Sequence, residues 1–360
     1  MTAAASAIAT TGRRSRRRRT AAEWTRIGVL TTAFAAIVIA FLSPLAYSFL
    51  TSIKTPQQIS AHDAPLLPSD PATFNYQGKD LPVYIVPMPD GSTRNLAIIK
   101  KGRQSSDFID PANPSAPAIT WQGSWRTLTQ PQQLSPHFEN YSQVWTLINF
   151  PRALINTILL AGIGTFGNVL SCTLVAYGFA RFRFPGKNLL FTVLIATIFL
   201  PAAVTLIPTY TIFARIGWVG TWLPLLVPAF FANAYDVFLL RQYLLTIPRD
   251  LDEAAAIDGA GPFRILRSVI LPQAWPVIIA VFVFSFVYLW NDFFDPLIYL
   301  AGHDEIQPLQ VVLAHFNGIY YENPAYIQAG NIMTLLIPVL LFVMFQRVFV
   351  RGIVITGVEK

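Results

Sequence analysis

Pro248-Arg-Asp-Leu-Asp-Glu-Ala-Ala-Ala-Ile-Asp-Gly-Ala-Gly-Pro262, which continues to Leu271-Pro272, is the most polar helix-forming segment of an otherwise apolar chain. A proline at the first position and three acidic residues within the next five suit the start of a helix, where the dipole is positive. Gly259 and Gly261 permit a sharp turn, after which Pro262 can begin a second short helix. The segment therefore predicts a helix, a glycine turn and a helix between two apolar spans.

The first of these helices has a narrow apolar stripe of small side chains with a charged rim. The stripe consists of Leu251, Ala254, Ala255 and Ile257. Small residues allow another protein surface to approach closely. We interpret the segment as a docking element for a partner that this chain does not contain.

The composition is typical of a membrane protein. Of the 360 residues, 53% are hydrophobic and 12% are charged, whereas a soluble domain carries about 25% charged residues. The single cysteine, Cys172, excludes an internal disulfide, and the four scattered histidines show no metal-ligand spacing. A phosphate-binding loop of the form GxxxxGK[ST] is missing, so we expect this chain to bind no nucleotide cofactor and no metal.

Six apolar stretches are each long enough to cross a bilayer as a helix, which takes about 20 residues. They are bracketed by charged residues and cover 27–53, 153–180, 188–214, 216–240, 268–291 and 323–346. Prolines within them predict kinked, non-parallel helices. The expected fold class is therefore an all-α polytopic membrane protein with six transmembrane helices.

The distribution of positive charge predicts the orientation of these helices. If the Arg-rich tail of residues 1–26 is cytoplasmic, the inner segments hold 17 of the 26 Lys and Arg residues. The positive-inside rule then places both termini and residues 248–272 in the cytoplasm. Nucleic-acid or anionic-lipid binding is the alternative interpretation of the tail, but an apolar span follows it at once, which favours a membrane anchor and no nucleic-acid partner.

Residues 54–150 form a long extracytoplasmic loop or insertion in this scheme. Residues 83–86 and 96–99 have the composition of two short strands around the turn signal at 89–92, and 119–128 could add another. A small β-rich subdomain is our prediction, and a poorly ordered spacer is the alternative. The sequence leaves the fold of residues 55–135 otherwise open.

Polar residues inside the spans mark a candidate path for the transported solute. They are Asn233, Tyr235 and Asp236 in the fourth span and Trp290 and Asn291 at the end of the fifth. Aromatic faces can stack on sugar rings while Asn and Asp bond to hydroxyl groups. Hydrogen bonding between helices, or an aromatic belt at the membrane surface, explains the same residues without a solute. Both interpretations remain open at this stage.

One segment resembles a known motif. Glu253-Ala254-Ala255, Gly259 and Leu271-Pro272 are spaced as in the EAA motif of ABC-importer permeases, although Val269 stands where Ile is usual. Residues 27–54 and 138–360 as a whole resemble the maltose-type carbohydrate permease family, specifically its shorter permease subunit. Residues 151–360 would then be the ABC permease core.

The resemblance implies partners and roles. The residues that would couple the chain to an ATPase are Glu253, Ala254, Ala255, Asp258, Gly259, Leu271 and Pro272. ATP and Mg²⁺ would be bound by a separate cytoplasmic ATPase dimer, so this chain would not itself be an enzyme. A second homologous permease would complete a heterodimer, and an extracytoplasmic solute-binding protein would deliver the solute. The location would be the cytoplasmic (inner) membrane of a prokaryote.

Other functions have to be weighed against a sugar permease. A permease for a related solute such as glycerol phosphate is possible within the same class, but the six apolar stretches contain no Lys or Arg for an anionic solute. An ion-coupled secondary carrier would require membrane acids and inverted repeats. Asp236 is the one acid well inside a span. A membrane enzyme would require a cluster of catalytic residues, and the sequence shows no such cluster.

Overall fold

The computed structural model describes residues 21–62, 64–318 and 321–355. The chain divides into two compact units, 1–48 and 49–360, which are treated separately below. Most of the predicted Arg-rich tail lies outside the described residues. Within the first unit, helix α1 begins at Ala21, and it continues to Ser52 in the second (Ala21–Ser52). Its apolar side chains are exposed all round, as expected of a helix surrounded by lipid.

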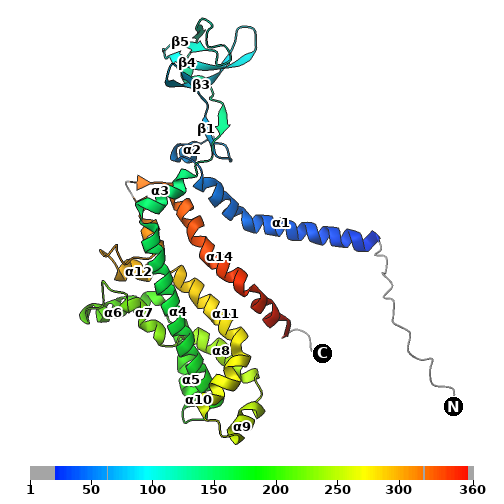
Figure 1. Cartoon of the computed structure of the whole chain (residues 1–360), viewed down its shortest axis with the longest axis vertical. Coiled ribbons are helices and arrows are strands. Elements are labelled where there is room, and N and C mark those ends of the chain that lie inside the picture. The colour runs from blue at the N-terminus through cyan, green and yellow to red at the C-terminus, as the bar shows by residue number, and fades with distance from the viewer. Residues whose placement is uncertain (1–20, 63, 319–320, 356–360) are drawn as a thin grey trace, which may run out of the picture. The chain divides into compact units, whose positions relative to one another are not determined.

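The second unit is mostly helical (Figure 1). Five helical stretches of the described residues are long and apolar enough to cross a membrane: Trp24–Ser52, Phe150–Arg181, Leu223–Thr246, Pro262–Trp290 and Pro324–Arg347. These confirm five of the six predicted spans. Three of these stretches are formed by the long helices α4 (Phe150–Arg181), α11 (Leu271–Trp290) and α14 (Pro324–Ile355).

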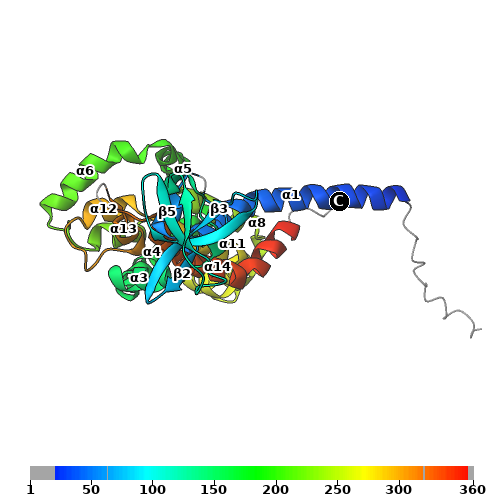
Figure 2. The same ribbon diagram turned by 90° about the horizontal axis from the view of Figure 1, so that it is seen from above.

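The predicted span over 188–214, in which prolines predicted a kink, is broken into two helices. This stretch forms α5 (Lys187–Ala196), a 3₁₀ turn η2 (Thr197–Phe199) and α6 (Ala202–Arg215), with a bend of 101° between the two halves (Figure 2). The cause is Pro201, which has no N–H for the helix and forces Leu200 into an extended conformation. Counted as one bent span, the pair brings the total for the described residues to six.

The fourth span, which was predicted to begin at residue 216, begins at Leu223 and is broken at Pro228. It consists of α7 (Leu223–Leu226), η3 (Pro228–Phe230) and α8 (Ala234–Thr246). Asn233 caps α8, because its side chain accepts a hydrogen bond from the backbone N–H of Asp236. The shorter helices that connect the remaining spans are α12 (Phe294–Tyr299) and α13 (Leu309–Ala314), followed by the two-residue strands β8 (Asn317–Gly318) and β9 (Tyr321–Glu322).

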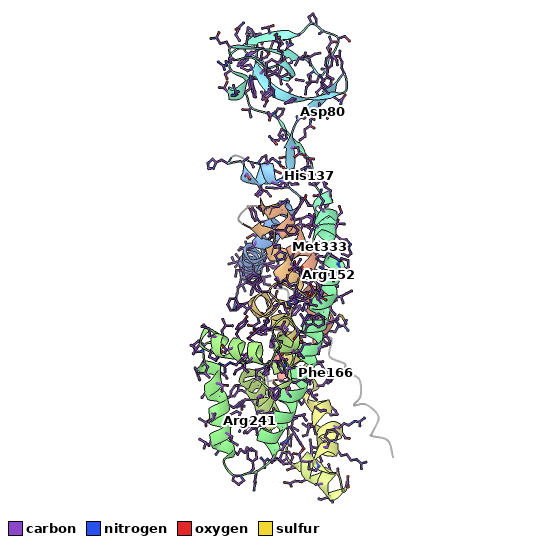
Figure 3. The ribbon with its side chains drawn as sticks, turned by 90° about the vertical axis from the view of Figure 1, so that its left-hand side faces the viewer. Asp80, His137, Arg152, Phe166, Arg241 and Met333 are labelled. Carbon is purple, nitrogen blue, oxygen red and sulfur yellow. The ribbon has the colours of Figure 1, made fainter. Side chains whose placement is uncertain are left out.

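Helix α4 is the centre of the helical bundle. It packs along α8 and α11 through small residues such as Cys172, Ala176 and Ala180, which are fully buried. At Gly167 a Cβ atom would lie 2.7 Å from the ring of Phe230, so only glycine allows this approach. Figure 3 labels Arg152 and Phe166 along the same helix.

The insertion between α1 and α4 contains an antiparallel sheet, which confirms the predicted small β-rich region. The sheet has the strand order β2-β3-β4-β5-β6, and β1 pairs with β7. The strands are β1 (Ser69–Pro71), β2 (Thr73–Tyr76), β3 (Lys79–Pro87), β4 (Thr93–Lys100), β5 (Ser105–Ile109), β6 (Ile119–Gln122) and β7 (Gln132–Leu134). Strands β3 and β4 form the predicted hairpin, whereas residues 125–127 of the predicted third strand form the 3₁₀ turn η1 (Trp125–Thr127).

A compact polar joint lies where the insertion returns to the helices. His137, in front of α3 (Glu139–Leu147), contacts Asp70 through Nε2 at 2.7 Å and Glu139 through Nδ1 (Figure 3). Burial lowers the pKa of His137, but the hydrogen bonds to Glu139 and Asp70 outweigh it and raise the pKa overall. The Asn140 amide donates to the carbonyl of Ser52 at 2.8 Å, and Gln58 of α2 (Pro56–Ser60) bonds to the loop before β1.

Replacing Phe108 tests whether the insertion is a cooperatively folded unit. Phe108 is fully buried between the sheet and Trp121, so Phe108→Ala should destabilise the insertion by about 3–5 kcal/mol. Limited proteolysis should then cut residues 66–134 much faster than in the parent protein. Ile99→Ala, at a 43% exposed position of the neighbouring strand, is the control and should change little. Equal cleavage of Phe108→Ala and parent would contradict a packed core.

Candidate coupling loop and polar network

The polar segment forms the predicted helix and glycine turn. Helix α9 covers Asp250–Ile257, and Gly259 follows with a φ of +78°, a conformation that side chains other than glycine rarely adopt. The predicted second short helix is not separate. α10 (Pro262–Ile265) runs through the π-helical turn η4 (Leu266–Ile270) into α11 as one span. The π-helical turn η4 lies just before Pro272, whose nitrogen carries no hydrogen and therefore cannot donate an α-helical hydrogen bond.

The outer face of this coupling loop, defined as residues 248–272, is apolar and uncovered. Ile257 is 86% exposed and Phe263 is 72% exposed, while α9 has no buried residue. Glu253, Ala254 and Asp258 are exposed on the same short helix. A large apolar side chain this exposed on a polar loop outside the predicted spans is the usual mark of a protein interface.

Two of the remaining predicted coupling residues pack toward the bundle. Ala255 and Leu271 are half-buried and pack against the core cluster around α4, and Pro272 is exposed at the first turn of α11. Of the seven residues, Ala255 and Leu271 are therefore half-buried and the other five are exposed.

Sequence reasoning missed two residues that hold this loop in place. The Nε atom of Arg181, at the end of α4, lies 3.0 Å from Oδ2 of Asp252 in α9. The hydroxyl of Tyr177, one turn earlier, donates to the carbonyl of Pro262 at 3.1 Å. Both residues lie in a stretch that resembles the maltose-type permeases, but the sequence does not show that they contact the coupling loop.

Asp236 is the centre of a buried hydrogen-bond network that joins three helices. Its Oδ2 accepts from the side-chain amides of Asn168 at 2.6 Å and Asn233 at 2.7 Å, and from the Ser285 hydroxyl at 3.2 Å. Asn233 also donates to Asn168 Oδ1 at 2.8 Å. Asp236 is 6% exposed. The network therefore connects α4, α8 and α11 inside the membrane-spanning bundle.

The five predicted path residues do not line one common cavity in the described structure. Asn233 and Asp236 belong to the buried network, whereas Tyr235 is 60% exposed on the other side of α8. Trp290 is 1% exposed and stacks on Phe286, and Asn291 is exposed and donates to the carbonyl of Val287.

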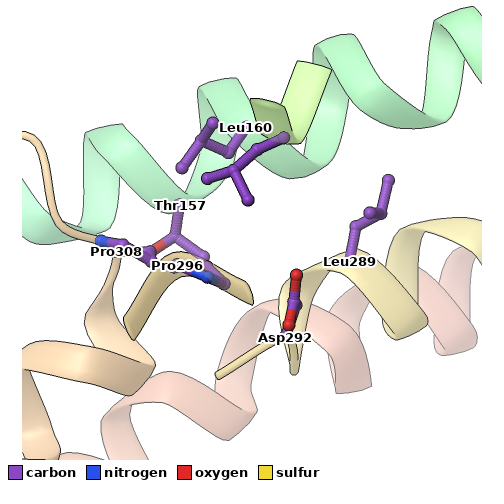
Figure 4. A pocket seen from close by; sticks show the side chains of 7 residues that line it. Thr157, Leu160, Leu289, Asp292, Pro296 and Pro308 are labelled. Carbon is purple, nitrogen blue, oxygen red and sulfur yellow. The ribbon is translucent and has the colours of Figure 1, made fainter. Parts of the chain in front are cut away.

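A cavity of about 20 Å³, room for roughly one water molecule, lies beyond the end of α11 (Figure 4). Thr157, Leu160, Leu289 and Asp292 are among the residues that line it. Burial and the neighbouring carboxylate of Asp295 raise the pKa of Asp292 to about 6. The cavity is too small for a sugar. In the described part of the chain, no group of three or more His, Cys, Asp and Glu side chains is arranged to hold a metal ion.

Comparison with known proteins identifies the family. A family model described as "Binding-protein-dependent transport system inner membrane component" matches residues 167–354. The chain is 31% identical over 255 residues to the osmoprotective compounds uptake permease protein GgtD of Synechocystis sp., covering 70% of this chain and 85% of that protein. It is 34% identical over 208 residues to the sn-glycerol-3-phosphate transport system permease protein UgpE of Pectobacterium atrosepticum, covering 57% and 73%.

A solved structure shows the same fold. A chain of a bacterial ABC transporter involved in the import of the acidic polysaccharide alginate superposes with a TM-score of 0.63 at 18% identity, covering 91% of this chain and 98% of that one. The matches define a membrane permease. The protein belongs to the family of binding-protein-dependent transport system inner membrane components, the permease subunits of ABC transporters, as the EAA-like motif predicted.

The network predicts a structural effect of Asp236. Asp236→Asn keeps one acceptor oxygen but exchanges a carboxylate for a weaker amide acceptor of the three hydrogen bonds, so it should destabilise the permease by about 1–3 kcal/mol. Thermal unfolding in detergent measures this. Asp304→Asn, which changes an exposed carboxylate between α12 and α13, is the control and should stay within about 0.5 kcal/mol. An unchanged melting temperature for Asp236→Asn would show that the network does not hold the helices together.

Asp292 predicts a pH dependence of stability. Its pKa of about 6 in the folded protein lies above its ordinary value, so the folded state binds the proton more tightly than the unfolded state. Its contribution is therefore most favourable at low pH and is lost as the pH rises from about 4 to 6. The melting temperature of Asp292→Asn should fall less over this range than that of the parent. Parallel curves for the two proteins would contradict the assignment.

Proposed function

We propose that this permease couples to a separate cytoplasmic ATPase through α9 and moves a neutral sugar or sugar-like solute into the cell by alternating access. The observation that carries the coupling is the uncovered apolar face of Leu251, Ile257 and Phe263 beside the acidic first turn of α9. Such a face fits a cleft of a partner subunit, and the loop is attached to spans on both sides.

The proposed orientation rests on the charges around the coupling loop. Two short loops carry them: one between the second and third spans holds Arg181, Arg183 and Lys187, and the coupling loop holds Arg249 and Arg264. Short loops that are rich in Lys and Arg are cytoplasmic. Both termini are then inside, and the β-rich insertion lies on the extracytoplasmic side, where a solute-binding protein would deliver its solute.

The partners follow from the ABC permease family. An ATPase dimer would bind ATP and Mg²⁺, so this chain would transport without catalysing a reaction itself. A second homologous permease would complete the pathway. The exposed aromatic side chains Phe231, Tyr235 and Tyr288 on the fourth and fifth spans give such a partner an apolar surface to pack against.

The proposed solute class rests on relatives and on charge. The relatives named above handle osmoprotective compounds or glycerol phosphate, and the structural neighbour is involved in the import of an acidic polysaccharide. The six apolar stretches hold no Lys or Arg to neutralise a phosphate, which favours an uncharged solute over glycerol phosphate. The buried network also weighs against an ion-coupled carrier, because Oδ2 of Asp236 already accepts three hydrogen bonds.

Ile257 tests the docking surface directly. Ile257→Asp places a charge on the face proposed to enter the ATPase, so it should abolish co-purification of the cognate ATPase in mild detergent. The permease itself should remain inserted, because this side chain is 86% exposed. Leu147→Asp changes a similarly exposed leucine at the end of α3, at the opposite end of α4, and should retain the ATPase. Normal ATPase capture by Ile257→Asp would exclude α9 as the docking helix.

A further inference from the structure

The last turn of α4 holds the coupling loop at three points. Arg181 faces Asp252 within α9, and its Nη2 donates to the carbonyl of Ile247, which precedes the loop, at 3.1 Å. Tyr177 holds the carbonyl of Pro262, which follows the glycine turn. The two side chains are four residues apart, so they leave the same face of the helix. One helix turn thus binds the loop before, within and after α9.

The contact between Arg181 and Asp252 is a buried ion pair rather than an aligned hydrogen bond, because Nε of Arg181 makes no hydrogen bond in the described part of the chain. The Arg181 side chain is 6% exposed and that of Asp252 is 20% exposed, so water screens this ion pair poorly. A guanidinium presents donors in a rigid plane and can meet a carboxylate and a carbonyl together, which the single ammonium of lysine does less well. Losing either partner would leave a buried charge without its counter-ion.

Helix α4 is suited to carry a displacement away from this point. Its 32 residues span about 48 Å without a proline in the interior. Midway, Asn168 joins it to Asp236 and Ser285. At the far end, the Asn156 amide donates to the carbonyls of Glu305 and Gln307, each at 3.0 Å. The bonded positions along α4 therefore link the coupling loop to the opposite end of the bundle (Figure 1).

We propose that Arg181 and Tyr177 are positioning residues that transmit the movement of α9 to α4. This inference rests on the proposed function, in which the ATPase moves α9. Without the two side chains, α9 would still dock through its outer face, which neither of them forms. The ATPase would then run while the transmembrane bundle responds weakly.

The test uses the full transporter with a reporter on α4. Phe166 lies on α4 and is 63% exposed, so Phe166→Cys accepts a fluorescent maleimide, whereas Cys172 is fully buried. The permease is reconstituted with its cognate ATPase and second permease, both free of cysteine, and the fluorescence change on adding ATP with vanadate is measured. Arg181→Met and Tyr177→Phe should each reduce this change, Arg181→Met by about fivefold or more, with ATPase capture and ATP hydrolysis retained.

Two further variants, Tyr243→Phe and Arg181→Lys, separate a loss of transmission from a loss of stability. Tyr177→Phe removes one hydroxyl and keeps the shape of the side chain, so it should fold even if Arg181→Met does not. Tyr243→Phe is matched to it, because the Tyr243 hydroxyl donates to the carbonyl of Gln273 at 3.2 Å, between two spans and not to α9. Tyr243→Phe should leave the fluorescence change intact. Arg181→Lys should recover part of the response lost in Arg181→Met.

The outcomes distinguish this inference from the function on which it rests. If the unaltered permease captures no ATPase, or its reporter ignores ATP, the proposed function fails. If it responds and the Arg181 and Tyr177 variants respond equally well, the transmission role is wrong and the proposed function stands. An equal loss in Tyr177→Phe and Tyr243→Phe would also overturn the inference, because the effect would then be general destabilisation.

Discussion

A polar group inside a membrane-spanning bundle is costly unless it finds a partner in the protein, and three side chains spread along α4 meet this constraint. Its amides at Asn156 and Asn168 and its charge at Arg181 are each matched by a group on another element. These partners come from α8, α9, α11 and the loop before α13. The constraint therefore makes α4 the helix through which the separate spans act as one body.

The same constraint explains what the sequence could show and what it could not. Charge-bracketed apolar stretches predicted five spans, and the pattern around Gly259 predicted the turn after α9, because these signals are local. The break at Pro201 was foreseen only as a kink, since a proline does not reveal its bend angle. Asp236 was noticed as unusual, but its partners Asn168 and Ser285 lie 68 and 49 positions away in the sequence, and hydrophobic periodicity cannot pair residues so far apart.

The insertion illustrates a second limit. The β3–β4 hairpin was predictable because its turn lies between two strands close in sequence, whereas β1 and β7 pair across more than sixty residues. The family match begins at residue 167, after the insertion. The insertion has a hydrophobic core of its own, which consists of Tyr84, Val86, Leu96, Ile98 and Phe108. This core holds the surface of the insertion in a fixed shape. On the proposed extracytoplasmic side, that surface is available to a binding protein.

The central claim is that α9 carries the contact between permease and ATPase, and site-specific cross-linking tests it most directly. Ile257→Cys places a thiol on the uncovered face, and Cys172 is too buried to compete. With a short bifunctional reagent and the cognate ATPase, this variant should give one cross-linked product of permease and ATPase, whereas Leu147→Cys should give none. A product from Leu147→Cys and none from Ile257→Cys would contradict the account.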